Sequence, residues 1–132
     1  MATNRISEIT TPEAPRATGP YSQAVSAGGF LFISGQIPLD PALMTPVEGG
    51  IAEQTMQVMK NIQAILGSAG LGFENVVRTE IFLKDMGTFA VVNQVYSSFF
   101  PREPMPARST VEVSRLPRDV LVEIACTAHL GK

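Results

Sequence analysis

Apolar positions recur with two different periods along the chain, and the changes of period predict where helices and strands lie. Over residues 51–69 the apolar side chains recur mostly at steps of three and four, and Gly70 follows as a stop signal, which predicts a helix packed on one face. Over residues 76–84 a mainly apolar set of side chains alternates with a mixed set, which is typical of a strand with one buried face. Asp85 can then cap a second helix, whose apolar stripe runs to Phe100.

Two further pairs of strands are predicted, one near each end of the chain. Residues 23–25 and 30–34 flank Ala27-Gly28-Gly29, which is typical of a hairpin turn. Residues 107–114 and 120–128 are joined by a turn-like segment at 115–119. The order β-β-α-β-α-β-β favours an α+β fold of two layers, with two helices packed on one face of a mixed β-sheet. The opposite face also needs cover, which another copy of the chain would supply in a closed cyclic oligomer.

Length and composition exclude several classes of protein. The 132 residues show no repeat or internal linker, so residues 1–132 are expected to form one domain. A hydrophobic fraction of 45% and a charged fraction of 17% exclude general disorder. The net charge of −2 makes nucleic acid an unexpected partner, and no apolar run is long enough for a membrane span. Because Glu8 and Glu13 interrupt the N-terminal region, no secretion signal is expected, and the predicted location is cytoplasmic.

The residue types that support familiar hydrolytic chemistry are scarce. Cys126 and His129 are the single cysteine and histidine. They cannot form a disulfide or a Cys/His metal cluster, and they give no firm basis for a Ser-His-Asp triad. Cys126 is expected to be a buried apolar residue.

Glu123 is the residue that the sequence singles out most clearly. It is the only charged side chain within residues 120–128, and an ionised carboxylate on a buried strand costs several kcal/mol unless it is paired. If the last two predicted strands form a tight hairpin, Glu123 lies opposite Thr110 and diagonal to Arg108. This register predicts either a site built from a guanidinium and a carboxylate, or a plain ion pair that seals a sheet face.

Four separated blocks of sequence carry a more specific signal. They are Gly19-Pro20-Tyr21-Ser22-Gln23-Ala24, Ile33-Ser34-Gly35-Gln36-Ile37-Pro38, Val92-Asn93 with Tyr96 and Phe99-Phe100, and Pro106-Ala107-Arg108-Ser109 continuing through Leu116-Pro117 to Val122-Glu123-Ile124. Together they resemble the reactive intermediate deaminase family (Rid, or YjgF) over nearly the whole chain. The resemblance implies a chorismate-mutase-like fold in a homotrimer with active sites between subunits, and no cofactor. It also implies hydrolysis of 2-aminoacrylate, 2-iminopropanoate and 2-iminobutanoate to 2-keto acids and ammonia.

The same resemblance assigns roles to particular residues. Arg108 corresponds to the clamp for the substrate carboxylate, and Glu123 to the acid near the attacking water. The further substrate-binding positions are Tyr21, Ser34, Gly35, Asn93 and Thr110. Thr110 stands where many members carry cysteine, and because the family uses the backbone carbonyl there, hydrolysis is expected to persist without any thiol chemistry.

Elementary chemistry is consistent with this assignment. An imine carbon is already electrophilic, so its hydrolysis needs only orientation, a water molecule and proton movement. Two alternatives remain open: a regulatory module that binds 2-keto acids without turnover, and a ribonuclease or translation inhibitor, as some members of the family have been described. The excess of positive charge over residues 102–118 is weak for a nucleic-acid-binding surface, which argues against the ribonuclease or translation inhibitor.

Overall fold

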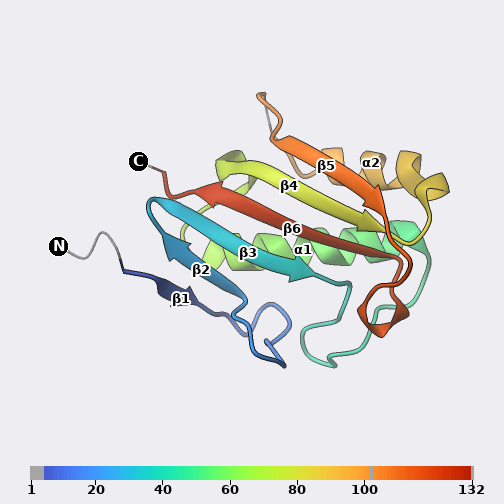
Figure 1. Ribbon diagram of the computed structural model, residues 1–132, viewed down its shortest axis with the longest axis horizontal. Coiled ribbons are helices and arrows are strands. Elements are labelled where there is room, and N and C mark those ends of the chain that lie inside the picture. The colour runs from blue at the N-terminus through green and yellow to red at the C-terminus, as the bar shows by residue number, and fades with distance from the viewer. Residues whose placement is uncertain (1–4, 102, 132) are drawn as a thin grey trace.

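A single mixed sheet with two helices on one face forms the fold (Figure 1). The computed structural model describes residues 5–101 and 103–131. Its strands are β1 (Ser7–Ile9), β2 (Ala24–Ala27), β3 (Phe30–Gln36), β4 (Val76–Leu83), β5 (Ala107–Glu112) and β6 (Val122–His129), and its helices are α1 (Ile51–Ser68) and α2 (Phe89–Ser97). The sheet order is β1-β2-β3-β6-β4-β5. The predicted α+β fold is therefore confirmed, with β1 as an additional edge strand that the sequence pattern did not predict.

The hairpin of β2 and β3 forms as the glycine pair predicts. Gly28 and Gly29 have φ values of +58° and +87°, which glycine adopts without the steric cost that a Cβ would bring. The turn pairs Ala27 with Phe30, and the antiparallel register continues to Ala24 and Ile33.

The predicted C-terminal hairpin is wrong. β5 pairs in parallel with β4, so that Thr110 lies beside Ile81, whereas β6 lies between β3 and β4 and places Glu123 beside Phe82. The connection through α2 makes β4 and β5 a crossover unit, and parallel neighbours require such a crossover. The predicted pairing of Glu123 with Thr110, and its diagonal contact with Arg108, are therefore wrong too.

The core lies between the helices and the sheet. α1 buries Val58, Ile62, Ile65 and Leu66, and β6 buries Val122, Ile124, Cys126 and Ala128 on the facing side. Fully burying a valine, leucine or isoleucine side chain contributes about 1.5–3 kcal/mol. The helix begins where the Gly50 N–H donates to the Glu53 carboxylate (2.9 Å). Hydrogen bonds to the carboxylate from the backbone of Glu53 itself, and then from Gly50, lower the pKa of Glu53. Cys126 is buried, as the sequence predicted.

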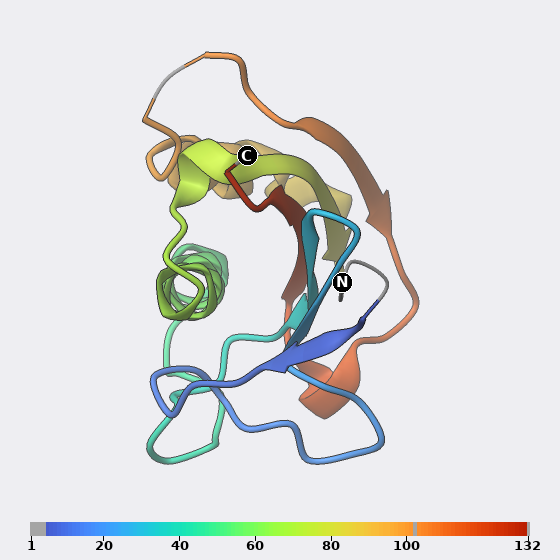
Figure 2. The ribbon, with the colours of Figure 1, turned by 90° about the vertical axis from the view of Figure 1, so that its left-hand side faces the viewer.

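In the described part of the chain, neither α1 nor α2 lies over the other face of the sheet (Figure 2). Along β6 the residues alternate between buried and partly buried, so Glu123, Ala125 and Thr127 face away from the helices. Phe30 and Phe32 of β3 remain 40% and 44% exposed. Cover by a second copy of the chain stays a prediction. Within residues 5–101 and 103–131, no helix has the length and apolar character to cross a membrane.

Candidate functional site

A cleft of about 490 Å³ opens at the end of β3. It lies between the segment that precedes β2, the loop that follows β3, the turn before β6 and the start of β6 itself. Its lining residues are Pro15, Arg16, Thr18, Tyr21, Gln23, Ser34, Gly35, Gln36, Ile37, Leu39, Pro117, Arg118 and Glu123. Four of the residues predicted to form the site, Tyr21, Ser34, Gly35 and Glu123, are thus brought together here.

Glu123 presents its carboxylate to this cleft beside a glycine. A Cβ at Gly35 would overlap Oε2 of Glu123 and lie 2.8 Å from its carboxyl carbon, so a larger residue at 35 would displace the carboxylate. Within the described residues the carboxylate has no hydrogen bond or ion pair. Burial raises the pKa of Glu123 above the ordinary value of 4.5. A partly buried carboxylate without a partner, in a cleft, is suited to taking up and releasing a proton.

Buried hydrogen bonds hold the wall of the cleft in place. The Gln23 side chain accepts from the Thr11 N–H (2.7 Å) and donates to the carbonyls of Thr11 (3.0 Å) and Pro15 (2.8 Å). The Ser34 hydroxyl donates to the Ser22 carbonyl at 2.6 Å. Because these bonds satisfy backbone groups that lack a sheet partner, they fix an irregular segment against β2 and β3.

Tyr21 is at the exposed side of the cleft. Its side chain is 54% exposed, and its hydroxyl accepts a long hydrogen bond of 3.4 Å from the Thr18 N–H. Gly19 lies beside the ring, and a Cβ there would be 3.4 Å from it, an ordinary van der Waals contact. Because more than half of the Tyr21 side chain is exposed, its ring is available to a ligand on the open face.

Arg108 lies elsewhere, against α2 on the helix side of the sheet. Its Nη1 donates to the Asn93 side-chain oxygen at 2.8 Å. Its guanidinium carbon is 5.4 Å from the ring centre of Phe89 and 5.1 Å from that of Tyr96, within cation–π range. The Tyr96 hydroxyl in turn pairs with Thr79 at 2.7 Å, and burial raises the pKa of Tyr96, which keeps the phenol protonated. The guanidinium is thus held in one orientation before any ligand binds.

Thr110 faces the same side of β5 as Arg108. Its hydroxyl is buried and, within the described residues, has no hydrogen-bond partner. A buried hydroxyl without a partner costs about 1–3 kcal/mol, so this position is suited to a polar group from outside the chain.

The predicted site residues therefore form two separate groups. Arg108, Asn93 and Thr110 lie on the helix side at β5, whereas the Glu123 group lines the cleft on the other face of β6. β4 stands between the two strands. A ligand cannot contact both groups in one chain.

Metal ligands do not gather anywhere in the described part of the chain. No group of three or more histidine, cysteine, aspartate or glutamate residues is placed to hold an ion there. Burial raises the pKa of Cys126 to about 12, and Nδ1 of His129 accepts a hydrogen bond from the Gly131 N–H (2.8 Å).

Comparison with known proteins identifies the family. Residues 11–130 match the protein-family model described as endoribonuclease L-PSP. A crystal structure from Yersinia pestis, described as a protein of unknown function of the conserved Rid family, superposes with a TM-score of 0.91 at 47% identity. The two share 94% of this chain and 98% of that one. The chain belongs to the Rid/YjgF family.

Curated relatives in the Rid family differ in how specifically they are named. A RutC family protein of Synechocystis is 55% identical over 92% of this chain and 95% of its own length. A mouse protein named 2-iminobutanoate/2-iminopropanoate deaminase is 45% identical over 93% of this chain and 90% of its own. The resemblance stated from the sequence blocks is confirmed, and the activity of this chain is a separate question.

Several residues that shape this Rid-family cleft were not predicted from the sequence. Asn61 is fully buried in α1 and donates to the carbonyls of Ile37 (3.3 Å) and Leu39 (3.1 Å), which positions the loop after β3. A buried asparagine on the apolar face of a helix was the available signal. Arg16 and Arg118 line the cleft but lie in irregular segments, where periodicity gives no direction for a side chain.

Proposed function

We propose that this Rid-family protein hydrolyses enamine and imine intermediates, 2-aminoacrylate with 2-iminopropanoate, and 2-iminobutanoate, to 2-keto acids and ammonia. The observation that supports this most strongly is the Glu123 carboxylate. It has a raised pKa, no partner within the described residues, and a glycine beside it that leaves room at its oxygens. The name of the mouse relative supports the same substrate class.

Arg108 is the proposed clamp for the substrate carboxylate. Asn93 engages one of the guanidinium donors, so others remain for a bidentate contact with a ligand carboxylate. The rings of Phe89 and Tyr96 restrict the orientation of the fork, which lowers the entropy lost on binding.

Glu123 is proposed to act on water. The water oxygen bonds to the imine carbon while the π electron pair of the C=N bond moves to nitrogen, one water proton passes to the carboxylate, and the nitrogen takes a proton from solvent. The resulting carbinolamine then expels ammonia: Glu123 returns its proton to the nitrogen, the electron pair of the breaking C–N bond leaves with that nitrogen, and the hydroxyl proton passes to solvent as the C=O bond forms. A carboxyl group with a raised pKa suits both directions of transfer.

The two groups of residues are proposed to meet between subunits. Because one group lies on the helix side of β5 and the other on the opposite face of β6, a complete site needs Arg108 from one chain and Glu123 from a neighbour. The open sheet face with exposed Phe30 and Phe32 supports such an assembly, proposed to be a closed homotrimer.

The direct test is release of keto acid and ammonia from freshly generated 2-iminopropanoate, measured against its spontaneous decay. Arg108→Ala should abolish the acceleration, and Arg108→Lys should restore it poorly because a point charge cannot reproduce the planar fork. Acceleration by folded Arg108→Ala at the wild-type level would refute the clamp. Binding of 2-keto acids without acceleration by the wild type would favour the regulatory alternative.

Mixing two inactive variants tests the shared site. Arg108→Ala and Glu123→Gln subunits, unfolded and refolded together in equal amounts, should recover about one quarter of the wild-type activity, because random assembly pairs intact halves at about one interface in four. A site contained in one chain would recover nothing.

A further inference from the structure

Two arginines line the cleft besides Glu123, and neither has a role in the hydrolysis proposed above. We infer that Arg16 and Arg118 form an anion subsite, which accepts a second carboxylate on an imino acid derived from an acidic amino acid. This inference rests on the proposed function for the identity of the reacting group, whereas the anion subsite itself can be tested without turnover.

Arg118 is held at the cleft by an unusual backbone. It and the following Asp119 have φ values of +60° and +57°, a region that residues other than glycine rarely adopt. Strained backbone of this kind persists only where the surrounding structure enforces it. Nη1 of Arg118 donates to the Met44 carbonyl at 3.3 Å, so the side chain is anchored through one donor and keeps the others.

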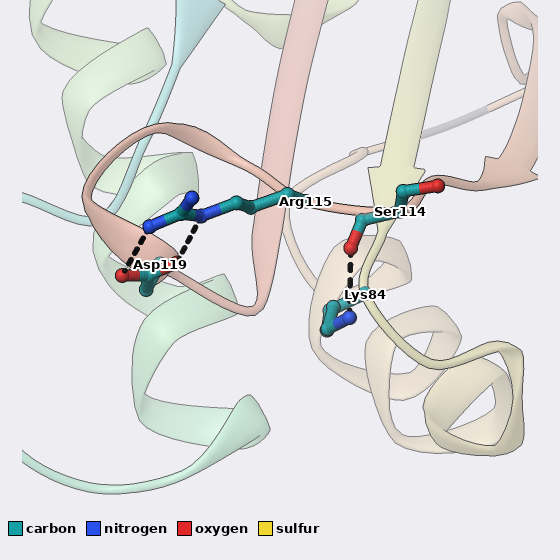
Figure 3. A network of polar contacts seen from close by, with 4 residues as sticks. All are labelled: Lys84, Ser114, Arg115 and Asp119. Carbon is teal, nitrogen blue, oxygen red and sulfur yellow. Dashed lines mark hydrogen bonds and ion pairs between the residues drawn. The ribbon is translucent and has the colours of Figure 1, made fainter.

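The neighbouring carboxylate does not neutralise Arg118. Asp119 is engaged by Arg115 in a two-point contact, with Nε to Oδ1 at 2.7 Å and Nη2 to Oδ2 at 3.2 Å (Figure 3). This contact lowers the pKa of Asp119 and keeps it ionised. Within the described residues, neither Arg16 nor Arg118 has an ion pair, so both charges are available to a ligand.

The balance of charge and space also favours a larger anion. Two arginines and one glutamate line the cleft, so its net charge is positive even when Glu123 is ionised. Its volume of about 490 Å³ falls in the range of sites for ligands much larger than a three-carbon imino acid. Arg16 and Arg118 complement the charge of a second carboxylate on a molecule whose first carboxylate is held by Arg108 of a neighbour.

Binding of two stable acids tests the subsite directly. Succinate and butyrate have four carbons each and differ in the second carboxylate. The wild type should bind succinate at least about tenfold more tightly, the effect expected of a charge-assisted hydrogen bond. Arg118→Gln and Arg16→Gln should each reduce that preference several-fold. Lys60→Gln, which removes a positive charge from the exposed side of α1, should leave it unchanged.

Three binding results would overturn the inference. Equal binding of the two acids by the wild type would show that no second anion is recognised. An equal loss for both acids in Arg118→Gln would mean that this residue holds the common carboxylate. A preference that survives in the Arg16→Gln, Arg118→Gln double variant would place the recognition elsewhere.

A turnover arm then tests substrate class. Imines of aspartate and alanine can be generated by an amino acid oxidase and compared as substrates. The ratio of kcat/KM for the aspartate imine to kcat/KM for the alanine imine should fall about tenfold in the double variant, because only the value for the aspartate imine decreases. An unchanged ratio would overturn the assignment to dicarboxylic substrates. If no imine at all were hydrolysed, the proposed function would fail, while the succinate preference would still decide whether the anion subsite exists.

Discussion

Replacing Gly35 with alanine should remove activity without unfolding the protein. The added Cβ would overlap Oε2 of Glu123 and lie 2.8 Å from its Cδ, and real Cβ atoms essentially never approach another atom within 3.0 Å. It would also lie 3.1 Å from Cγ, which is a tight contact. The backbone at Gly35 does not have a positive φ, so alanine can adopt its conformation and the cost is confined to the carboxylate.

The magnitude follows from how far that carboxylate must move. Clearing the overlap displaces Oε2 by about 1 Å, and a misplacement of this size in a catalytic group lowers turnover by about 10²-fold. Stability should change little, because Glu123 gives up no hydrogen bond within the described residues when it rotates.

Saturation kinetics on 2-iminopropanoate, beside thermal unfolding, measure both effects. Gly67→Ala is the matched control, because a Cβ at this position in α1 meets no atom within 4 Å and alanine favours a helix by about 1 kcal/mol. It should keep full turnover and unfold at a slightly higher temperature. If Gly35→Ala folds and its kcat stays within about threefold of the wild-type value, the position of the carboxylate is not critical and the reasoning is refuted, because a fall in kcat of about 10²-fold is expected.

Three further predictions concern Glu123, the Tyr96 network and assembly. Glu123→Gln should lower kcat by about 10²–10⁴-fold. Since burial raises the pKa of Glu123, the stability linked to its protonated form is present below the unfolded-state pKa and is lost as pH rises through the folded value. The variant should therefore unfold at a higher temperature than wild type at pH 7 and at the same temperature at about pH 3, and a lower Tm at pH 7 would contradict this. Tyr96→Phe should destabilise the protein by about 1–3 kcal/mol, because it leaves the Thr79 hydroxyl unpaired. Adding Thr79→Val to the same chain should recover most of that loss in denaturant unfolding. If it does not, the 2.7 Å contact does not contribute to stability. Light scattering should give a mass of three chains of 14.2 kDa each, and a monodisperse monomer would remove the shared site.

The sequence predicted the elements better than their partners. Residues 51–69 were predicted as a helix and α1 spans Ile51–Ser68, because its apolar period and its stop signal agree. Pairing between strands is different, since alternation shows which face is buried but not which strand lies alongside. Taking β5 and β6 as a hairpin followed the common tendency of consecutive strands to pair, whereas the crossover through α2 and the central place of the apolar β6 decided the real order.

The candidate site shows the same division. Glu123 was identified from its chemistry alone, as one charge in an apolar strand, and the structure places it in a cleft beside Gly35. Its distance from Arg108 depended on the strand partners and was predicted wrongly. The roles of Gln23 and Asn61 depend on backbone groups in irregular segments, whose course no periodicity reports.

The chemistry of sulfur in this chain has a consequence for its tolerance of oxidants. Reactive cysteines act as thiolates, and a buried thiol with a pKa of about 12 is almost entirely protonated at neutral pH. Cys126 is the only cysteine in the sequence, and position 110, in the Arg108 group, holds a threonine. Peroxide and alkylating reagents therefore have no accessible sulfhydryl to modify near either group of site residues, and any inactivation by them in the native protein would have to proceed through methionine or through exposure of the core.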